Sequence, residues 1–229
     1  MTEVLDEPAV VKACLAVPTR GYIWHETAMQ VGHLNPIFYR EKLSVANVRN
    51  MIVRDFLENK HGEFELLFMC DDDVVPPTRE FAQQMSVLPY DVVGCPTPMS
   101  KLPDMPIVLN IFNKREDGNW VTAQNLLPET GHMAVDAVGT GLIMIRRHVL
   151  EHPEMSMPFN QTLDSDGTIQ VGQDINFCIR ARSLGFTVGV SADLICDHFV
   201  GVHLNTIPYC YGNPINSPAE VKEITPSAA

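Results

Sequence analysis

The sequence lacks the features that would place a protein in a membrane or along nucleic acid. No apolar run in its 229 residues approaches the ~20 residues of a membrane-spanning helix. The first ten residues are acidic and lack the basic flank and apolar core of a signal peptide. The 16 basic residues form no block and are outnumbered by 28 acidic ones, for a net charge of −12. These absences argue against a general nucleic-acid binder, although one cleft could still hold a nucleic acid locally.

Closely spaced cysteine pairs are also missing. The six cysteines are far apart and include no Cys-x-x-Cys, which argues against a zinc site and a disulfide framework. We expect buried, reduced thiols, and hence a cytoplasmic location, from four cysteines that lie in or beside apolar runs: Cys14, Cys70, Cys95 and Cys196. With 45% hydrophobic and 19% charged residues, the composition predicts one globular domain with a sizeable core.

The most informative stretch is an apolar run, residues 64–70, that leads directly into Asp71, Asp72 and Asp73. The run has the length of a buried strand, and open α/β sheets bind their ligands at the carboxyl ends of such strands. Adjacent carboxylates raise one another's pKa unless a cation lies among them. A hard divalent ion, Mg²⁺ or Mn²⁺, supplies that charge and also binds substrate phosphates. A solvated acidic turn is the alternative.

Apolar runs and helical spacing alternate along the chain, which predicts an α/β fold. Buried strands are expected at residues 10–17, 64–70, 90–95 and 186–190. Helices are expected at residues 23–31, 42–59, 78–88 and 171–184. Residues 107–112 and 120–125 predict a hairpin, and with it a small antiparallel part of a mixed sheet. Asn35-Pro36 predicts a further helix start, because proline suits the first helical position.

Several other residues are candidates for binding, although each also has an ordinary structural explanation. Residues 18–20 follow the first strand, where a nucleotide could bind or a simple βα turn could form. The Gly-Thr-Gly of residues 139–141 allows the backbone to approach a ligand closely, or a helix to pack against it. Asp174 opens a helix, where capping is the simpler role. His198 and His203 form no metal motif by themselves.

Taken in order, these features resemble the GT-A glycosyltransferases, in particular the family 2-like enzymes of bacteria and their phages. The resemblance rests on Pro18-Thr19-Arg20, Val48-Arg49-Asn50, Asp71-Asp72-Asp73, Val138-Gly139-Thr140-Gly141, Gly172-Gln173-Asp174 and a downstream His198. It covers about residues 10–205 and implies a single Rossmann-like α/β domain between tails at residues 1–9 and 206–229. The implied sheet is mixed, mostly parallel and flanked by helices.

The resemblance also implies a metal site. Asp71 and Asp73 match the Asp-x-Asp pair, with Asp73 as the direct ligand of Mn²⁺ or Mg²⁺ and Asp71 or Asp72 nearer the ribose. His198 matches the distal histidine that completes the site, with His203 in reserve. The ion would bridge the phosphates of a nucleoside-diphosphate sugar and stabilise the leaving diphosphate.

The remaining implied contacts concern the nucleotide, the sugar and the acceptor. The nucleotide would be held by Pro18, Thr19, Arg20 and Arg49, and the donor sugar would lie beside Gly139, Thr140 and Gly141. Lys101 is the only cation of a prolyl loop whose composition indicates a mobile or substrate-facing segment, and we expect it to contact the donor. Asp174 matches the base that takes the acceptor's proton in inverting members, here after Gln173 in place of the commoner Glu.

Two other functions compete with an inverting hexosyltransferase. A nucleotidyltransferase shares the nucleotide sheet and acidic metal site, but its triphosphate would want a glycine-rich, basic loop after the first strand. A non-catalytic metal- or carbohydrate-binding module would use the carboxylates structurally. The sequence leaves open the donor's sugar and base, the oligomeric state and the acceptor, which could be protein, glycan, lipid or modified nucleic acid.

Overall fold

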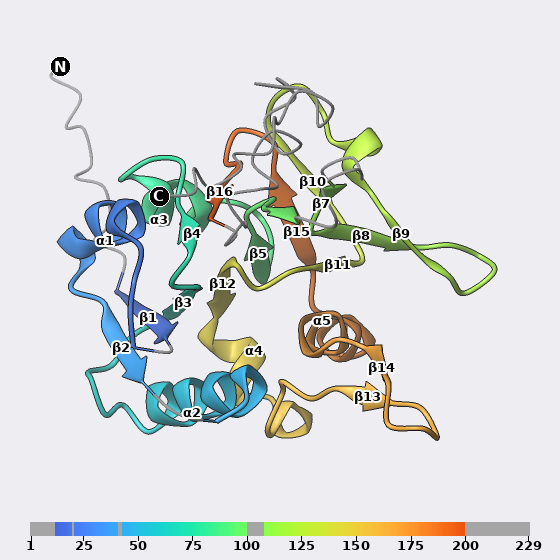
Figure 1. The fold of residues 1–229 in the computed structure, drawn as a ribbon, viewed down its shortest axis with the longest axis horizontal. Helices are drawn as coiled ribbons and strands as arrows, with labels where there is room; N and C mark the ends of the chain where they lie inside the picture. Colours follow the sequence, from blue (N-terminus) through green and yellow to red (C-terminus); the bar gives the residue numbers. More distant parts are fainter. Residues whose placement is uncertain (1–11, 20, 41–42, 100–107, 200–229) are drawn as a thin grey trace, which may run out of the picture. The chain divides into compact units, whose positions relative to one another are not determined.

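A central seven-stranded sheet organises the protein (Figure 1). The computed structural model describes residues 12–19, 21–40, 43–99 and 108–199. The strand order is β10-β15-β5-β12-β3-β1-β2. The strands are β1 (Ala13–Thr19), β2 (Ile37–Arg40), β3 (Leu66–Cys70), β5 (Val92–Gly94), β10 (His132–Ala134), β12 (Leu142–Arg146) and β15 (Val188–Ser191). Among these strands, only β10 and β12 run against the rest. The expectation of a mixed, mostly parallel sheet is therefore confirmed.

Helices cover both faces of this sheet (Figure 1). On one face lie α2 (Val45–Leu57), α4 (Arg147–Glu151) and α5 (Gln173–Ser183); on the other lie α1 (His25–Val31) and α3 (Phe81–Ser86). Strand β3 shows why both faces are covered. Its Leu67 and Met69 pack with the first group of helices, whereas Leu66, Phe68 and Cys70 pack with the second. Since alternate residues of a strand point to opposite faces, a strand that is apolar throughout needs a core on each side.

Smaller sheets accompany the central sheet in the described part of the chain. The predicted hairpin is present as β8 (Ile111–Lys114) and β9 (Trp120–Thr122), and β11 (Ala137–Val138) pairs with β8. Three two-stranded pairs are β6 (Pro98–Met99) with β7 (Val108–Leu109), β4 (Val74–Val75) with β16 (Asp197–His198), and β13 (Thr162–Leu163) with β14 (Ile169–Val171). The 3₁₀ turns are η1 (Gly32–Leu34), η2 (Gln124–Leu126) and η3 (Pro153–Met155).

The helix expected to start at Asn35-Pro36 is wrong, because this segment enters a strand. Asn35 adopts a left-handed conformation, with φ 51° and ψ 60°, and its N–H closes η1 on the carbonyl of Gly32. Strand β2 then runs parallel to β1 at the edge of the sheet. Its Ile-Phe-Tyr run favours a strand, and Tyr39 turns into the core. The order is therefore β-α-β-α-β, and the expected β-α-α-β is corrected.

The cysteines behave as the sequence predicts. Cys14, Cys70, Cys95, Cys178 and Cys196 are all buried and free. Burial raises the pKa of Cys14 to about 11 and that of Cys178 to about 12, so both remain neutral thiols at physiological pH. Among the described residues, no helix combines the length and the apolar character that crossing a membrane requires.

Asp91, just before β5, forms hydrogen bonds with the start of β15 and with α4. Its Oδ2 accepts hydrogen bonds from the backbone N–H and the hydroxyl of Thr187, at 2.8 and 2.7 Å, ahead of β15. Its Oδ1 accepts from His148 Nε2 of α4 at 2.9 Å. Partial burial by itself raises the pKa of Asp91, but these hydrogen bonds outweigh burial and lower the pKa.

Candidate active site

The candidate site forms where three neighbouring strands meet at one edge of the central sheet. Pro18 and Thr19 end β1, and the acidic triplet follows β3 directly. Strand β12 is antiparallel to β3, so the residues before its first position lie at the same edge. The backbone N–H of Asp71 donates to the carbonyl of Gly141 at 2.8 Å. Parallel and antiparallel neighbours thus bring separate parts of the sequence together.

Two adjoining pockets at this edge contain most of the expected site residues. The first, about 300 Å³, is lined by Pro18, Thr19, Leu43, Val45, Val48, Asp71, Asp72 and Asp73. The second, about 260 Å³, is lined by Val45, Arg49, Asp71, Val74, Thr97, Pro98, Met99, Asn110, Gly139, Thr140, Gly141, Asp174 and His198. The pockets share Val45 and Asp71, and together they form one candidate cleft, to which we refer as the acidic cleft.

Arg49 of α2 balances part of the charge of the triplet. Its Nη2 lies 2.6 Å from Asp71 Oδ1, and the arginine side chain is only 3% exposed. Loss of hydration raises the pKa of Asp71, Arg49 opposes this, and the neighbouring Asp73 and Asp72 carboxylates add to the rise. Among the described residues that line the acidic cleft, Arg49 is the only lysine or arginine. The cleft therefore holds more carboxylates than cations.

The backbone of the triplet is held from both sides by a stacked aromatic pair. The N–H of Trp24 donates to the carbonyl of Asp72 at 2.9 Å, and the N–H of Phe199 donates to that of Asp73 at 2.8 Å. The rings of Trp24 and Phe199 stack with centroids 4.8 Å apart. These contacts hold the backbone of the loop and do not involve its carboxylates.

His198 lies beside Asp73 because β16 pairs with β4. In this register His198 is opposite Val74, the residue after Asp73. Its Nδ1 lies 2.8 Å from the carbonyl oxygen of Pro98, which can only accept, so Nδ1 carries the proton of a neutral ring. Its Nε2 faces Asp73 Oδ1 at 3.6 Å. The neighbouring Asp73 carboxylate raises the pKa of His198, while partial burial acts in the opposite direction.

Asp174 reaches the acidic cleft from the first turn of α5. The N-cap of α5 is Gly172, so Asp174 lies inside the helix, where its Oδ1 accepts from the backbone N–H of Ile175 at 2.9 Å. Asp174 also lines the second pocket. The helix is anchored by an ion pair of 2.6 Å between Arg182 and Asp136. Asp174 thus contacts the backbone of the first turn and also lines the cleft, and its role as a base stays a prediction.

Some residues expected in the site are not described by the structure, and some residues that line the cleft were not expected. Arg20, Lys101 and His203 lie outside the described residues. Thr97 and Asn110 line the acidic cleft, although sequence reasoning assigned them no role. Each follows a short strand-like run, and no motif marks either one. Their position emerges only from the pairing of β6 with β7 and of β8 with β11.

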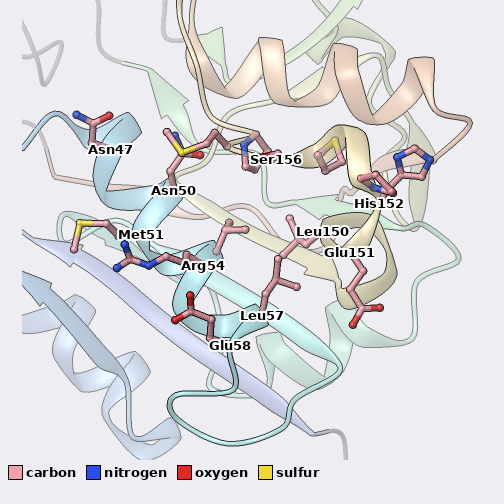
Figure 2. A pocket seen from close by; sticks show the side chains of 15 residues that line it. Asn47, Asn50, Met51, Arg54, Leu57, Glu58, Leu150, Glu151, His152 and Ser156 are labelled. Atoms are coloured by element: carbon pink, nitrogen blue, oxygen red, sulfur yellow. The ribbon is translucent and has the colours of Figure 1, made fainter.

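A larger pocket in the described part of the chain lies elsewhere. It measures about 750 Å³ and lies between α2 and the segment of residues 150–158 (Figure 2). Figure 2 shows that its lining side chains come from α2 and from the segment that holds Leu150, Glu151, His152 and Ser156. None of the predicted binding, catalytic or metal-ligating residues lines it, although Asn50 of the Val48-Arg49-Asn50 motif does. The size of a pocket is a weaker indication of an active site than the convergence of carboxylates and a histidine. The acidic cleft is therefore the stronger candidate.

Comparison with known proteins identifies the class and then the family. A mixed sheet covered on both faces, with an acidic triplet at its strand ends, is the architecture of the GT-A fold. The model of glycosyltransferase-like family 2 matches residues 26–207, and the chain belongs to this family. Glycosyl transfer is the activity that this membership supports. No curated protein matches the chain significantly in sequence.

Two solved structures share the fold. The crystal structure of A197 from STIV has a TM-score of 0.56 and 19% identity, and the match covers 83% of this chain and 87% of that one. The crystal structure of GalNAc-T7 with UDP, GalNAc and Mn²⁺ has a TM-score of 0.52 and 10% identity. That match covers 86% of this chain but 45% of the other, so the chain spans less than half of GalNAc-T7. Identities this low demonstrate a common fold and nothing finer.

Proposed function

We propose that the protein transfers a hexosyl group from a nucleoside-diphosphate sugar to an acceptor hydroxyl, with inversion at the anomeric carbon. The observation that carries the proposal is the convergence of Asp73, His198 and Asp174 on the acidic cleft from three distant parts of the chain. The likeness to GalNAc-T7, whose structure holds UDP, GalNAc and Mn²⁺, supports a nucleotide donor and a divalent ion.

The chemistry of the donor set fits a divalent metal ion. Asp73 and His198 would hold it, because the Nδ1 contact with Pro98 leaves Nε2 of the neutral ring without a proton and therefore able to bind an ion beside Asp73 Oδ1. A mixed carboxylate and imidazole set accords with Mn²⁺ better than with Mg²⁺, which prefers oxygen ligands. Within the described ranges, no three His, Cys, Asp or Glu side chains converge to hold an ion alone. We therefore propose that phosphate oxygens of the donor and water complete the coordination, so that ion and nucleotide bind together.

The proposed reaction is a single displacement. The acceptor oxygen attacks the anomeric carbon and forms the new glycosidic bond, while the bond from that carbon to the diphosphate oxygen breaks. The electron pair of the broken bond leaves with the nucleoside diphosphate, and Asp174 takes the proton of the acceptor hydroxyl. When bound, the divalent ion stabilises the negative charge that builds up on the leaving diphosphate. Arg49 positions Asp71 through their ion pair.

A thermal-shift panel tests this proposal. The wild-type chain is heated with UDP, GDP, CDP and dTDP and with their glucosyl esters, each with and without Mn²⁺. We expect one base to raise the melting temperature only when Mn²⁺ is present, because the ion needs the phosphates as ligands. Stabilisation by Mn²⁺ alone, with no further effect of any nucleotide, would instead indicate a structural metal-binding module.

The variant Asp73→Ala makes the same test specific to the site. It removes a carboxylate that is one-quarter exposed, so the fold should persist. The nucleotide-dependent shift should disappear, and so should sugar transfer. Asp193→Ala is the matched control, because this aspartate also belongs to a loop but lines neither pocket of the acidic cleft. Undiminished transfer by Asp73→Ala would refute the proposed metal site.

A further inference from the structure

Asn110 occupies a position in the acidic cleft that the family resemblance leaves unexplained. It lies between β7 and β8 and is only 6% exposed, yet it lines the second pocket together with Thr140 and Asp174. Burying an amide side chain is unfavourable unless its polar atoms are satisfied. The partners of each atom of Asn110 therefore indicate what its side chain does.

The backbone and one side-chain atom of Asn110 are fully engaged. Its N–H donates to the carbonyl of Thr97 at 3.0 Å, and its own carbonyl accepts from the N–H of Gly139 at 2.8 Å. The side-chain Oδ1 accepts from the N–H of Thr97 at 2.8 Å. A backbone N–H can only donate, so this contact fixes which end of the amide is oxygen and which is nitrogen. The amide therefore has one orientation.

The other end of the amide, Nδ2, carries two N–H donors that no described residue accepts. No hydrogen bond joins this nitrogen to another part of the described chain, although the other polar atoms of Asn110 are paired. The nitrogen is also absent from the atoms that are sealed off from both solvent and partners, namely Thr27 Oγ1, Arg49 Nε and Gln173 Oε1. Because Asn110 is buried elsewhere and lines the pocket, these donors open onto the acidic cleft.

Gly139 makes room for this amide. A Cβ atom at position 139 would lie 2.5 Å from Asn110 Nδ2 and 2.9 Å from its Cβ, closer than real Cβ contacts come. A side chain at position 139 would thus displace the amide from its place in the pocket wall. The glycine of the Gly-Thr-Gly segment therefore has a specific role here, which is to admit a side chain that carries hydrogen-bond donors.

We infer that Asn110 recognises the donor sugar by donating from Nδ2 to one of its hydroxyl oxygens. This inference rests on the proposed function, because it assumes that the sugar lies in the second pocket between His198 and Asp174. A site built to hydrogen-bond a hydroxyl discriminates against ligands that lack it, since its buried polar groups are then unpaired. Asn110 is thus a specificity-determining residue for the sugar, separate from the groups that hold the diphosphate.

Asn110→Asp and Asn110→Ala test this inference together. The aspartate keeps an oxygen for the N–H of Thr97 but replaces the donating amine by an acceptor, whereas the alanine removes both ends without adding charge. The matched control is Asn113→Asp on β8. Asn113 Oδ1 also accepts a backbone N–H, from Asp136 at 3.1 Å, but Asn113 lines neither pocket of the cleft.

The measured quantity is the ratio of two dissociation constants in the presence of Mn²⁺, that of UDP over that of UDP-glucose. If the thermal-shift panel selects another base, the corresponding pair is used. An added charge acts on the diphosphate of both ligands, so its effect largely cancels in the ratio. Loss of one hydrogen bond to the sugar should lower the ratio about three- to tenfold in Asn110→Ala, whereas in Asn110→Asp the hydroxyl can only donate, which changes the ratio by a different factor. The ratio should stay within twofold of wild type in Asn113→Asp, a margin of about 0.4 kcal/mol by the usual conversion.

The possible outcomes separate this inference from the proposed function. If wild type binds both ligands with Mn²⁺ and the ratio is unchanged in both Asn110 variants, Asn110 only clamps Thr97 and the inference is overturned. If affinities for both ligands fall equally, the residue serves the diphosphate or the fold, which also overturns it. If wild type binds neither ligand, the proposed function fails, and the inference fails with it.

Discussion

Replacing Asp174 by asparagine separates its contact with the helix backbone from its proposed role as a base. Asparagine has almost the same size and keeps an oxygen at the position of Oδ1. The hydrogen bond from the N–H of Ile175, now 2.9 Å, can therefore persist at the start of α5. We expect the free energy of unfolding to change by less than about 1 kcal/mol, the typical cost of losing a helix cap outright.

The effect of Asp174→Asn on the reaction should be much larger. An amide cannot take the proton of the acceptor hydroxyl, and general base catalysis contributes about 10²–10⁴ to a rate. This range corresponds to about 2.7–5.4 kcal/mol of activation free energy at 1.36 kcal/mol per tenfold. Donor binding should stay within about threefold of wild type. The ion proposed to bind the donor phosphates is held by Asp73 and His198, and the variant changes neither residue.

The assay measures single-turnover release of nucleoside diphosphate from the donor selected by the thermal-shift panel, with donor affinity determined in parallel. Asp117→Asn is the matched control. Asp117 Oδ1 also accepts a nearby backbone N–H, from Asn119 at 2.9 Å, but Asp117 lies at the exposed tip of the β8–β9 hairpin. A rate for Asp174→Asn within threefold of the control would refute the proposed base and leave Asp174 with its helix contact alone.

Three further predictions concern stability. Arg49→Met should lower the free energy of unfolding by about 2 kcal/mol in urea titrations. The expected loss is smaller than the ~3–5 kcal/mol for breaking a fully buried pair, because Asp71 is 29% exposed. An unchanged midpoint would show that the ion pair contributes nothing to stability. Gly189→Ala should lower the free energy of unfolding by about 1–3 kcal/mol, because the new Cβ would overlap the ring of Tyr90. A melting temperature equal to that of wild type would show that the ring moves freely. Asp91 should stabilise the protein above its unfolded-state pKa of about 3.9 and lose that contribution as the pH falls through its lower folded-state pKa. The wild type should therefore lose more stability than Asp91→Asn between pH 5 and pH 2, and parallel pH profiles for the two would contradict the assignment.

The parts of the fold that sequence reasoning predicted correctly are those with long, regular patterns. The apolar face of α2 repeats over several turns, and the run that forms β3 is apolar at every position. Such patterns report burial directly, because a helix face or a doubly covered strand cannot avoid being apolar. The hairpin of β8 and β9 was equally readable, since two strand-like runs flank a polar tip.

The error at Asn35-Pro36 has a local cause. Proline fixes φ near the value shared by helices and extended chains, so its presence does not distinguish a helix start from a strand start. The left-handed conformation of Asn35 turns the chain out of η1 and aligns the next residues with β1. Pairing with a strand some twenty positions earlier decided the outcome, and a local motif does not carry that information.

The acidic cleft was only partly determined by the sequence. The chain by itself specified the chemistry, which is a triplet of carboxylates after a buried strand, a glycine-flanked threonine and an aspartate in the first turn of a helix. These features are local, because each depends on residues that are neighbours in the chain. Their order along the chain was enough to suggest the family.

Tertiary structure decided which of these groups meet and what they contact. The two-residue pairing of β16 with β4 brings His198 to Asp73, and a strand that short leaves no periodic signal in the sequence. The same is true of Arg49, which reaches Asp71 from α2, and of Asn110, whose amide is oriented by Thr97. Local patterns determine which residues are buried and which residues form turns. The partners of a polar side chain are instead set by strand order and register across the whole sheet.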